Sequence, residues 1–403
     1  MLSYEQARQK IIEQVGKNRG PRATTLVSVW DALGLVLSQE VKTDREYPPF
    51  DRSTRDGYAV RAKEAVPGAK LKCVGEIKAS DTVRDELAAG TCLQIMTGAA
   101  VPKRADAVVM IEHTSREGDV VRFEREAQQS QNIVARGSEA AAAQTILRPG
   151  LRLGYAELAL AAQVGAVPFE CAKRPRVAIL STGDEVVLVD ETPGPFQIRN
   201  SNSVSLSAQV RIAGGEPIVL GNAADRIEDL GNKIERGLKE DMLVLSGGVS
   251  MGKYDLVENV LKAMGAEFFF DAVAIRPGKP AVFGICQGKP VFGLPGNPVS
   301  TMVTFELFVA PAIDLLSGAE ARALPLVEAR LAEAMKEKTG LTHFLPARVE
   351  WRGASPEVKA LKWQGSGDIA ALARANCFLV VPADREKIAV GESVSILLRK
   401  DIV

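Results

Sequence analysis

The sequence predicts a multidomain α/β fold. We expect a doubly wound, mostly parallel α/β domain, an inserted β-rich domain, a helical linker domain and a small, barrel-like C-terminal β domain. Strand-like and helix-like runs alternate over 173–321, which is typical of a parallel sheet with helices on both faces. Short β-like runs separated by Gly, Pro and charges fill 44–137 and 322–403. The 403 residues are enough for two to four domains, each with its own core.

The two segments 1–43 and 138–172 are predicted to form the helical domain. Apolar residues recur at helical spacing near the N-terminus, and a second helix is expected from about Ser28. A short apolar-faced helix is expected over 155–164. We expect both segments to pack together as a linker and dimerisation domain. The β-rich segment 44–137 would then be an insertion between them.

The clearest pattern lies in the predicted α/β domain, 173–321. Its strand-like runs are 176–180, 216–220, 242–245, 267–275, 281–285 and 291–294. The last run leads through Pro-Gly-Asn-Pro into a long helix that ends near Leu316. Ligands bind beyond the carboxyl ends of parallel strands, so functional residues are expected where these runs end. Residues 322–403 are predicted to form the C-terminal β domain.

Composition excludes several classes of protein. Lys+Arg and Asp+Glu each number 50, so there is no basic surplus of the kind that nucleic acid requires. Two histidines and five scattered cysteines argue against a His-rich metal site, a disulfide framework or a zinc site. The N-terminus lacks the apolar core of a signal peptide, and no run of 18 apolar residues predicts a membrane span. We therefore expect a cytoplasmic enzyme that binds neither nucleic acid nor membrane.

The run Met242–Leu245 ends in Ser246-Gly247-Gly248, and a helix is expected to begin at Asp255. Two glycines allow backbone N–H groups to point in one direction, and the serine hydroxyl adds a donor. This loop is therefore a candidate anion site. The alternative is a plain strand–turn–helix connection in which Asp255 only caps the helix.

Carboxylates gather at the predicted strand ends: Asp184, Glu185, Asp225 and Asp255. Thr182 and Gly183 lie in the same loop as the first two. Acidic residues beside an anion site indicate Mg²⁺, which prefers oxygen ligands and bridges to phosphates. Each acid alone is equally explained as a solvated helix cap. Arg276 and Lys279 flank a Pro-Gly turn and add two cations.

Two further polar residues stand out in the β-rich segment. Asp56 precedes Gly57 at the start of a predicted strand, and Thr97 follows another strand in a loop of small residues. An ordinary turn explains the first, and a loop hydroxyl without a role explains the second.

Five segments follow one another along almost the whole chain: 53–59 (STRDGYA), 96–99 (MTGA), 181–185 (STGDE), 246–250 (SGGVS) and 293–300 (GLPGNPVS). Together they resemble the MoeA family of molybdopterin molybdenumtransferases, which includes the gephyrin E domain. The resemblance implies an elongated, four-part protomer that forms a homodimer with shared active sites. It also implies insertion of molybdate into adenylylated molybdopterin, with release of AMP and a need for a divalent metal, taken here as Mg²⁺.

The resemblance also implies roles for individual residues. The catalytic set is Asp56, Thr97, Glu185, Asp225 and Asp255, of which the last three would hold Mg²⁺. The cofactor-binding set is Thr182, Gly183, Asp184, Ser246, Gly247, Gly248, Pro295 and Pro298, joined by the oxyanion-pocket residues Arg276, Lys279, Ser300, Arg348 and Ser366. Arg276 stands where relatives usually carry a lysine. We expect Asp56 and Thr97 to reach in from the partner chain.

Two alternatives remain at this point. One is a pterin adenylyltransferase or nucleotide hydrolase built on the same α/β domain. The other is a non-catalytic scaffold like the gephyrin E domain. The inserted and C-terminal domains argue against the first, and the intact acids and basic residues argue against the second. Transient contacts with the adenylyltransferase and with molybdoenzyme acceptors would accompany the transferase function.

Overall fold

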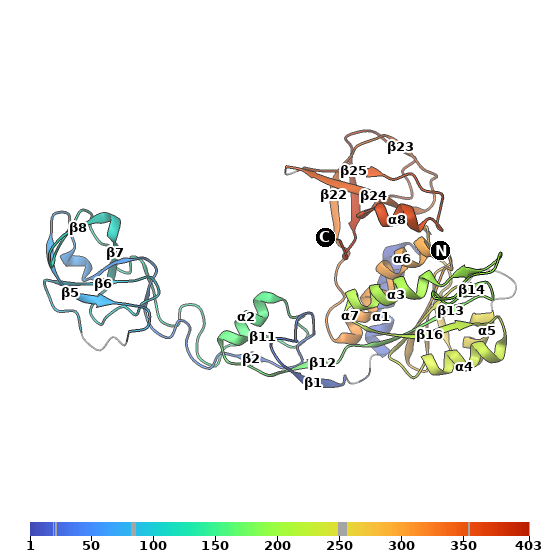
Figure 1. The fold of residues 1–403 in the computed structure, drawn as a ribbon, viewed down its shortest axis with the longest axis horizontal. Helices are drawn as coiled ribbons and strands as arrows, with labels where there is room; N and C mark the ends of the chain where they lie inside the picture. Colours follow the sequence, from blue (N-terminus) through green and yellow to red (C-terminus); the bar gives the residue numbers. More distant parts are fainter. Residues whose placement is uncertain (19, 21, 82–85, 249–255, 354, 403) are drawn as a thin grey trace.

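The chain forms four lobes arranged along an extended molecule (Figure 1). This computed structural model describes residues 1–402 except 19, 21, 82–85, 249–255 and 354. A β-rich lobe stands at one end and is joined by a narrow middle lobe to an α/β lobe at the other end. A β-barrel lobe packs beside the α/β lobe, and the C-terminus lies in it.

The α/β lobe contains a six-stranded sheet of order β16-β13-β17-β21-β20-β18. Its strands are β13 (Arg176–Thr182), β16 (Glu216–Ala223), β17 (Met242–Ser246), β18 (Glu267–Phe270), β20 (Val282–Cys286) and β21 (Lys289–Leu294). The pairs β13–β16, β13–β17 and β17–β21 are parallel, and β20 runs antiparallel to both of its neighbours. The predicted mostly parallel sheet is confirmed. The run predicted over 267–275 is not one strand, because it divides after Phe270.

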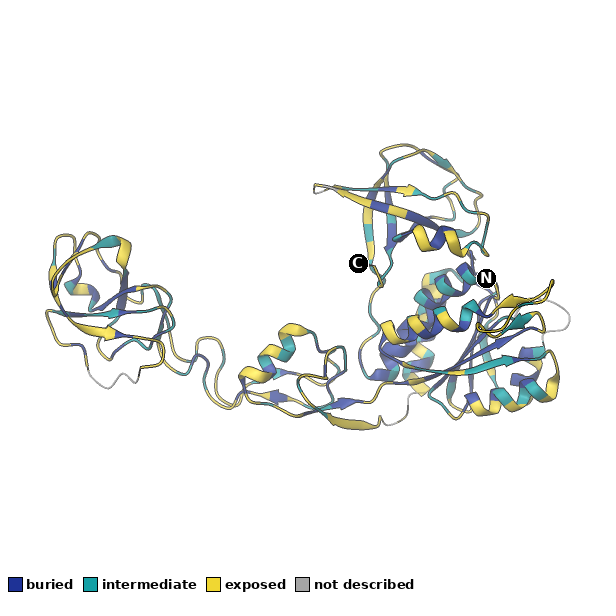
Figure 2. Ribbon diagram, in the orientation of Figure 1, coloured by how far each residue is buried: buried dark blue, intermediate teal, exposed yellow. Residues whose placement is uncertain are grey.

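Helices cover both faces of this sheet. They are α1 (Tyr4–Asn18), α3 (Ser201–Ala213), α4 (Ile227–Gly237), α5 (Leu256–Ala263), α6 (Pro298–Thr304), a π-helical turn η3 (Phe305–Val309) and α7 (Ala310–Ser317). One core joins alternate strand residues such as Val177 and Val244 to α1, α3, α6 and α7. A second core joins Ala178 and Leu243 to α4 and α5. The alternation of side chains along each strand therefore fills two separate cores. In Figure 2 the strands of this sheet are largely buried.

The continuous helix Pro298–Ser317 is long and apolar enough to cross a membrane by length and composition alone. However, 83% of its most apolar window is buried inside the protein. It is therefore the core helix of a folded lobe. Its apolar surface packs against the sheet and α1.

The middle lobe is built from two chain segments that lie side by side. Its elements are β1 (Thr24–Val27), β2 (Val41–Lys42), β11 (Thr145–Leu147), α2 (Tyr155–Gln163) and β12 (Phe169–Ala172). β1 pairs with β12 and β2 with β11, both antiparallel. The helix expected from Ser28 is wrong, because the backbone there bonds to the returning segment: Gly34 N–H donates to Leu153 O, and Leu37 N–H to Leu151 O. α1 also differs from expectation, because its buried face joins the core of the α/β lobe.

The β-rich lobe follows a neck formed by β3 (Arg52–Ser53) and β10 (Ile133–Val134). Its sheet has the order β7-β4-β6-β5-β9-β8. The elements are β4 (Gly57–Val60), η1 (Ala62–Glu64), β5 (Lys70–Ile77), β6 (Thr91–Ile95), β7 (Ala107–Met110), η2 (Ile111–His113), β8 (Thr114–Glu117) and β9 (Val120–Phe123). Phe123 and Tyr58 meet edge-on in its core. Cys73 and Cys92 are buried there with free thiols, as expected for core cysteines.

The C-terminal lobe is a closed barrel with one appended strand. Its order is β19-β24-β25-β22-β28-β26, and an additional β24–β26 pairing closes the ring. The elements are β19 (Ile275–Arg276), β22 (Leu326–Leu331), β23 (Met335–Lys336), β24 (Thr342–Arg352), β25 (Ser355–Ala360), α8 (Ile369–Arg374), β26 (Cys377–Val381), β27 (Lys387–Ile388) and β28 (Ser393–Leu398). β19 comes from the α/β segment and pairs with β24, so the barrel is joined to that lobe by backbone hydrogen bonds.

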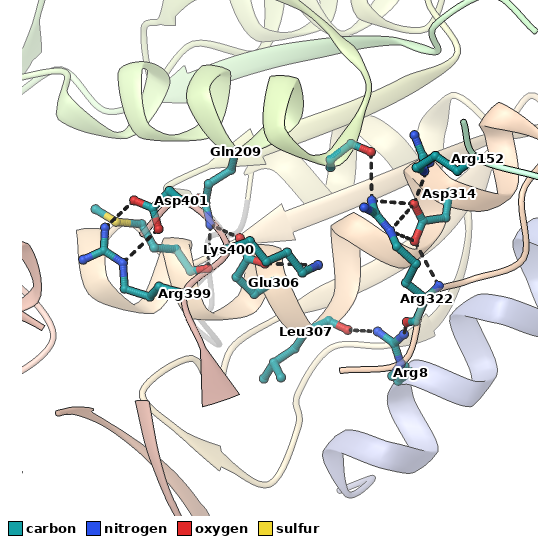
Figure 3. Close-up of polar contacts among 12 residues, drawn as sticks. Arg8, Arg152, Gln209, Glu306, Leu307, Asp314, Arg322, Arg399, Lys400 and Asp401 are labelled. Carbon is teal, nitrogen blue, oxygen red and sulfur yellow. Dashed lines mark hydrogen bonds and ion pairs between the residues drawn. The ribbon is translucent and has the colours of Figure 1, made fainter. Parts of the chain in front are cut away.

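A buried ion-pair cluster joins the middle and α/β lobes (Figure 3). Asp314 on α7 is 1% exposed. Its Oδ1 lies 3.0 Å from Nη2 of Arg152, which follows β11 of the middle lobe, and 2.7 Å from Nη2 of Arg322. Arg152 also donates to Gly34 O (2.7 Å), and Arg8 on α1 donates to Leu307 O (3.2 Å). One carboxylate therefore links side chains of both lobes to the core helix.

Candidate active site

A cavity of about 470 Å³ opens at the carboxyl edge of the central sheet. It is lined by Ser181, Thr182, Gly183, Glu185, Val186, Ile198, Arg199, Asn200, Ser201, Asn202, Asp225, Ser246, Gly247, Gly248, Pro280, Pro295, Gly296, Asn297 and Pro298. The ends of β13, β17 and β21 all contribute to it. Nine of the predicted site residues thus surround one cavity, as the strand-end argument expects.

The floor of the cavity is formed by Thr182 and the Ser246-Gly247-Gly248 loop. Gly247 and Gly248 have φ of +90° and +64°, a conformation that favours glycine. A Cβ on Gly248 would lie 2.7 Å from Thr182 Oγ1, so a side chain there would also meet the neighbouring strand. Thr182 Oγ1 is buried and has no hydrogen-bond partner among the described residues. It is therefore available to a ligand in the cavity.

The acidic side of the cavity carries Glu185 and Asp225, with Asp184 beside them. The backbone N–H of Asp225 donates to Asp184 Oδ1 at 3.2 Å. Partial burial, followed by the nearby charges of Asp184 and Glu185, raises the pKa of Asp225 above its ordinary value. Like charges are therefore held close together, an arrangement that a bound cation would relieve.

The predicted third acid, Asp255, lies outside the described residues, so its position relative to Glu185 and Asp225 is not part of this geometry. Within the described part of the chain, no group of three His, Cys, Asp or Glu side chains is arranged to hold a metal ion. The described part of the cavity thus offers two carboxylates at its wall. Mg²⁺ commonly binds proteins through one or two carboxylates and completes its shell with substrate phosphates and water.

Sequence reasoning missed one wall of the cavity, which comes from β14 (Val186–Val187), β15 (Ile198–Arg199) and the start of α3. Ile198 N–H donates to Glu185 O at 2.8 Å, which folds this wall back over the cavity. Asn200 caps α3 by accepting from Ser203 N–H. Arg199 is the one basic residue among the described lining residues. The sequence feature that could have pointed to this wall is an Asn beside polar residues at the start of a helix. By itself this pattern predicts only a helix cap.

The five predicted oxyanion-pocket residues do not line this cavity, but three of them lie on segments that meet one another. Gly278, between Arg276 and Lys279, packs against Thr304 on α6, because a Cβ there would lie 2.5 Å from the Thr304 side chain. Ser300 on α6 is buried, and the adjacent Val299 N–H donates to Ser366 O at 2.9 Å. The turn with Lys279, the helix with Ser300 and the loop with Ser366 thus meet around α6.

The two arginines of that set each lie beside an acidic residue. Arg276 is exposed, and its Nη1 lies 4.0 Å from Glu337 Oε2 in the barrel lobe. Arg348 on β24 is exposed, and its Nε lies 3.6 Å from Glu350. Both guanidinium groups therefore have acidic neighbours, and an anion between them would compete with these exposed pairs.

Asp56 and Thr97 meet each other in the β-rich lobe. Asp56 Oδ1 accepts from the backbone N–H of Thr97 (2.6 Å) and from its hydroxyl (2.8 Å), and these bonds hold the pKa of Asp56 below its ordinary value. Gly57 has no room for a side chain, since a Cβ would lie 2.0 Å from Val109 O. Asp56 precedes β4 and Thr97 follows β6. The lobe that contains these strands lies at the opposite end of the molecule from the central sheet (Figure 1). One chain by itself does not bring the two groups together.

Comparisons with known proteins cover nearly the whole chain. Three family models match in succession: "MoeA N-terminal region (domain I and II)" over residues 2–165, "Probable molybdopterin binding domain" over 178–315, and "MoeA C-terminal region (domain IV)" over 328–398. A molybdopterin molybdenumtransferase of Staphylococcus aureus is 30% identical over 404 residues, covering 98% of this chain and 95% of the relative. That of Staphylococcus epidermidis is 30% identical over 383 residues, covering 92% and 90%.

Solved structures agree with these matches. The crystal structure of a molybdopterin biosynthesis MoeA protein from Pyrococcus horikoshii is 30% identical and covers 99% of both chains, with a TM-score of 0.75. A second structure from this organism is 27% identical with a TM-score of 0.82, covering 99% of this chain and 100% of its own. Since these relatives match from end to end and in every lobe, the chain belongs to the MoeA family of molybdopterin molybdenumtransferases.

Proposed function

We propose that this enzyme inserts molybdate into adenylylated molybdopterin and releases AMP in a Mg²⁺-dependent reaction. The observation that carries the proposal is the cavity itself, which combines two carboxylates with the Ser-Gly-Gly loop and a buried threonine hydroxyl that has no partner in the described part of the chain. A phosphate-bearing substrate needs hydrogen-bond donors and a cation, and this combination supplies the first and can hold the second.

The acidic residues fit Mg²⁺ chemically. Glu185 and Asp225 offer hard oxygen ligands. Partial burial, followed by repulsion from Asp184 and Glu185, raises the pKa of Asp225, and a divalent cation would offset that repulsion. We assign these two residues as metal ligands, together with Asp255. When bound, Mg²⁺ would act as a Lewis acid and as a template for the phosphates. The fit requires no histidine or cysteine, in keeping with the composition.

The remaining lining residues would bind and orient the substrate. Thr182 and Ser246 present hydroxyl groups, and Gly247 and Gly248 allow the backbone to approach closely. Arg199 adds positive charge beside the substrate phosphates. Pro295 and Pro298 hold the loop that leads into α6, and Thr301 on that helix donates to Pro295 O at 2.5 Å. Such fixed donors provide most of the rate in phosphoryl chemistry by positioning and electrostatics.

Molybdate would bind near the residues that gather around α6. We assign Lys279, Ser300 and Ser366 to this place, with Arg276 and Arg348 joining after exchange of their exposed acidic partners. The oxyanion would then lie beside the pterin dithiolene. Water would add to the phosphoanhydride bond, which breaks and releases AMP from the pterin phosphate. The two dithiolene thiol groups would bind molybdenum and give up their protons, and one molybdate oxygen would leave with these protons as water.

Asp56 and Thr97 require a second chain under this proposal. They lie in the lobe farthest from the cavity (Figure 1), so we infer a homodimer in which the β-rich lobe of one protomer reaches the cavity of its partner. Their mutual hydrogen bonds keep Asp56 ionised and fixed in orientation. We also propose a cytoplasmic location, where the buried thiols remain reduced, and transient contacts with the adenylyltransferase and with molybdoenzyme acceptors.

The test is AMP release from adenylylated molybdopterin, with and without molybdate and Mg²⁺. We expect release only when both are present, with molybdenum retained on the pterin. Glu185→Ala should abolish release while leaving the melting temperature close to that of the wild type. A wild-type enzyme that binds the nucleotide and leaves it intact under every condition would refute the proposed reaction.

A further inference from the structure

Asn202 carries a buried carbonyl oxygen without a hydrogen-bond partner among the described residues. The side chain lines the cavity and lies one residue into α3. Its Nδ2 donates to Ser246 Oγ and to Gly296 O, each at 2.8 Å. A backbone carbonyl can only accept, so the amide nitrogen must face Gly296. The orientation of Oδ1 is therefore fixed by its neighbours.

An unpaired buried acceptor is unfavourable, because it has lost water without gaining a partner. Apart from a metal ion, the group that satisfies Oδ1 must be a hydrogen-bond donor, an N–H or an O–H. A phosphate or molybdate oxygen is an acceptor and would meet Oδ1 with repulsion. The position of Asn202 in the cavity wall thus identifies a place that suits an uncharged, donor-bearing part of a ligand.

Two other polar residues of the wall, Thr182 and Arg199, have the opposite preference. Thr182 Oγ1 is also buried and unpaired in the described structure, but a hydroxyl can donate to an anion. Arg199 carries only donors and a positive charge. Apart from its two carboxylates, the described lining of the cavity therefore contains groups that suit anionic oxygen and a fixed neutral acceptor, Asn202 Oδ1, that rejects it.

We propose that Asn202 Oδ1 is a specificity-determining acceptor, which binds an N–H or O–H group on the uncharged part of the substrate. This rests on the proposed function, in which the substrate has such donors on the pterin ring, the ribose and the adenine. Asn202 then sets the direction in which the substrate lies, because phosphates are excluded from its position.

The experiment is isothermal titration of the full-length enzyme with three probes: adenylylated molybdopterin, AMP and inorganic pyrophosphate. Pyrophosphate is an anion whose outer atoms are almost all acceptors. The variants are Asn202→Ala and a matched control, Gln209→Ala. Gln209 lies on the same helix, and its Nε2 donates to Met302 O (3.1 Å) and Glu306 Oε1 (2.9 Å), while Oε1 is buried and unpaired in the described structure (Figure 3). It does not line the cavity.

Asn202→Ala is expected to weaken binding of adenylylated molybdopterin about five- to tenfold, the effect of one lost hydrogen bond to a neutral donor. Pyrophosphate affinity should stay within about twofold, and Gln209→Ala should leave all three affinities unchanged. An equal loss for AMP places the donor on the nucleoside, and unchanged AMP binding places it on the pterin. Unchanged affinity for adenylylated molybdopterin would overturn the assignment, as would an equal loss for all three probes.

Melting curves accompany each titration, and Asn202→Leu, of similar volume, replaces the alanine variant if that does not fold. Failure of this inference differs from failure of the proposed function. If the wild type releases AMP and Asn202→Ala binds normally, only the role of Asn202 is wrong. If the wild type releases no AMP, the reaction is wrong, whatever the titrations give.

Discussion

Asp225 couples the acidic wall of the cavity to pH. Its pKa is raised by partial burial and by Asp184 and Glu185, so the fold disfavours its ionised form. The unfolded chain releases this proton at lower pH than the folded chain. Without metal, stability from this group is therefore greatest at low pH and falls as pH rises from the ordinary value of 3.8 through the higher folded value.

Asp225→Asn should remove this decrease in stability with rising pH. At pH 7 in EDTA the free energy of unfolding of the variant should equal that of the wild type or exceed it by less than about 1 kcal/mol, because the side chain is largely exposed to solvent. Its melting temperature should therefore equal or slightly exceed that of the wild type. Added Mg²⁺ should raise the wild-type melting temperature more than that of the variant, and AMP release should drop on the order of 100-fold. Thermal melts from pH 3.5 to 7 check the first point. An equal response of both proteins to Mg²⁺ would remove Asp225 from the metal ligands.

At the residue scale, the sequence predicts what stands at the ends of regular strands. Glu185 and Asp225 follow β13 and β16, and both line the cavity as the topology requires. Arg199 and Asn202 were not predicted, because they reach the cavity through a chain reversal at β14 and β15 that no periodicity marks. The carbonyl of Asn202 becomes informative only when its neighbours Ser246 and Gly296 are placed around it.

At the scale of elements, alternating patterns predict the central sheet well because each strand fills two cores. Val177 and Ala178 are neighbours in sequence and belong to different cores. The failed helix after Ser28 has the opposite cause. Trp30 is 90% exposed, and the backbone of this stretch is satisfied by Leu151 and Leu153, more than 100 positions away. Where only a few apolar residues recur at helical spacing, such tertiary partners decide which secondary structure the segment adopts.

The buried Asp314 cluster predicts a strong effect from one substitution. Asp314→Ala leaves Arg152 and Arg322 without their shared partner at the junction of two lobes. Removing one member of a buried pair costs about 3–5 kcal/mol, because the remaining charges stay desolvated. Chemical denaturation of the purified protein measures this loss of stability.

An exposed ion pair serves as the control for that measurement. Glu386→Ala removes the partner of Lys336, whose Nζ lies 3.0 Å from Oε1 in a pair that is more than half exposed on both sides. We expect a change below about 0.5 kcal/mol. A loss of similar size in both variants would show that the Asp314 cluster acts like any surface pair and does not fix the lobes.

On the scale of the whole molecule, the separation of Asp56 from the cavity becomes a prediction about two chains. If each active site combines Asp56 of one protomer with Glu185 of its partner, neither Asp56→Ala nor Glu185→Ala homodimers contain an intact site. A mixed dimer contains one site with both substitutions and one with neither. Random exchange makes half of the dimers mixed, so the mixture should recover about a quarter of wild-type AMP release.

The measurement is AMP release after the two inactive variants are unfolded together and refolded, with each refolded alone for comparison. Mixing Glu185→Ala with Asp225→Asn provides the matched control, because both substitutions lie on the same side of the cavity. In that mixture every site carries one defect, so activity should stay at the level of the separate variants. Recovery in the control mixture, or none in the first, would contradict a site shared between chains. A site shared between two chains accounts for a protomer whose β-rich lobe lies so far from its own α/β lobe (Figure 1).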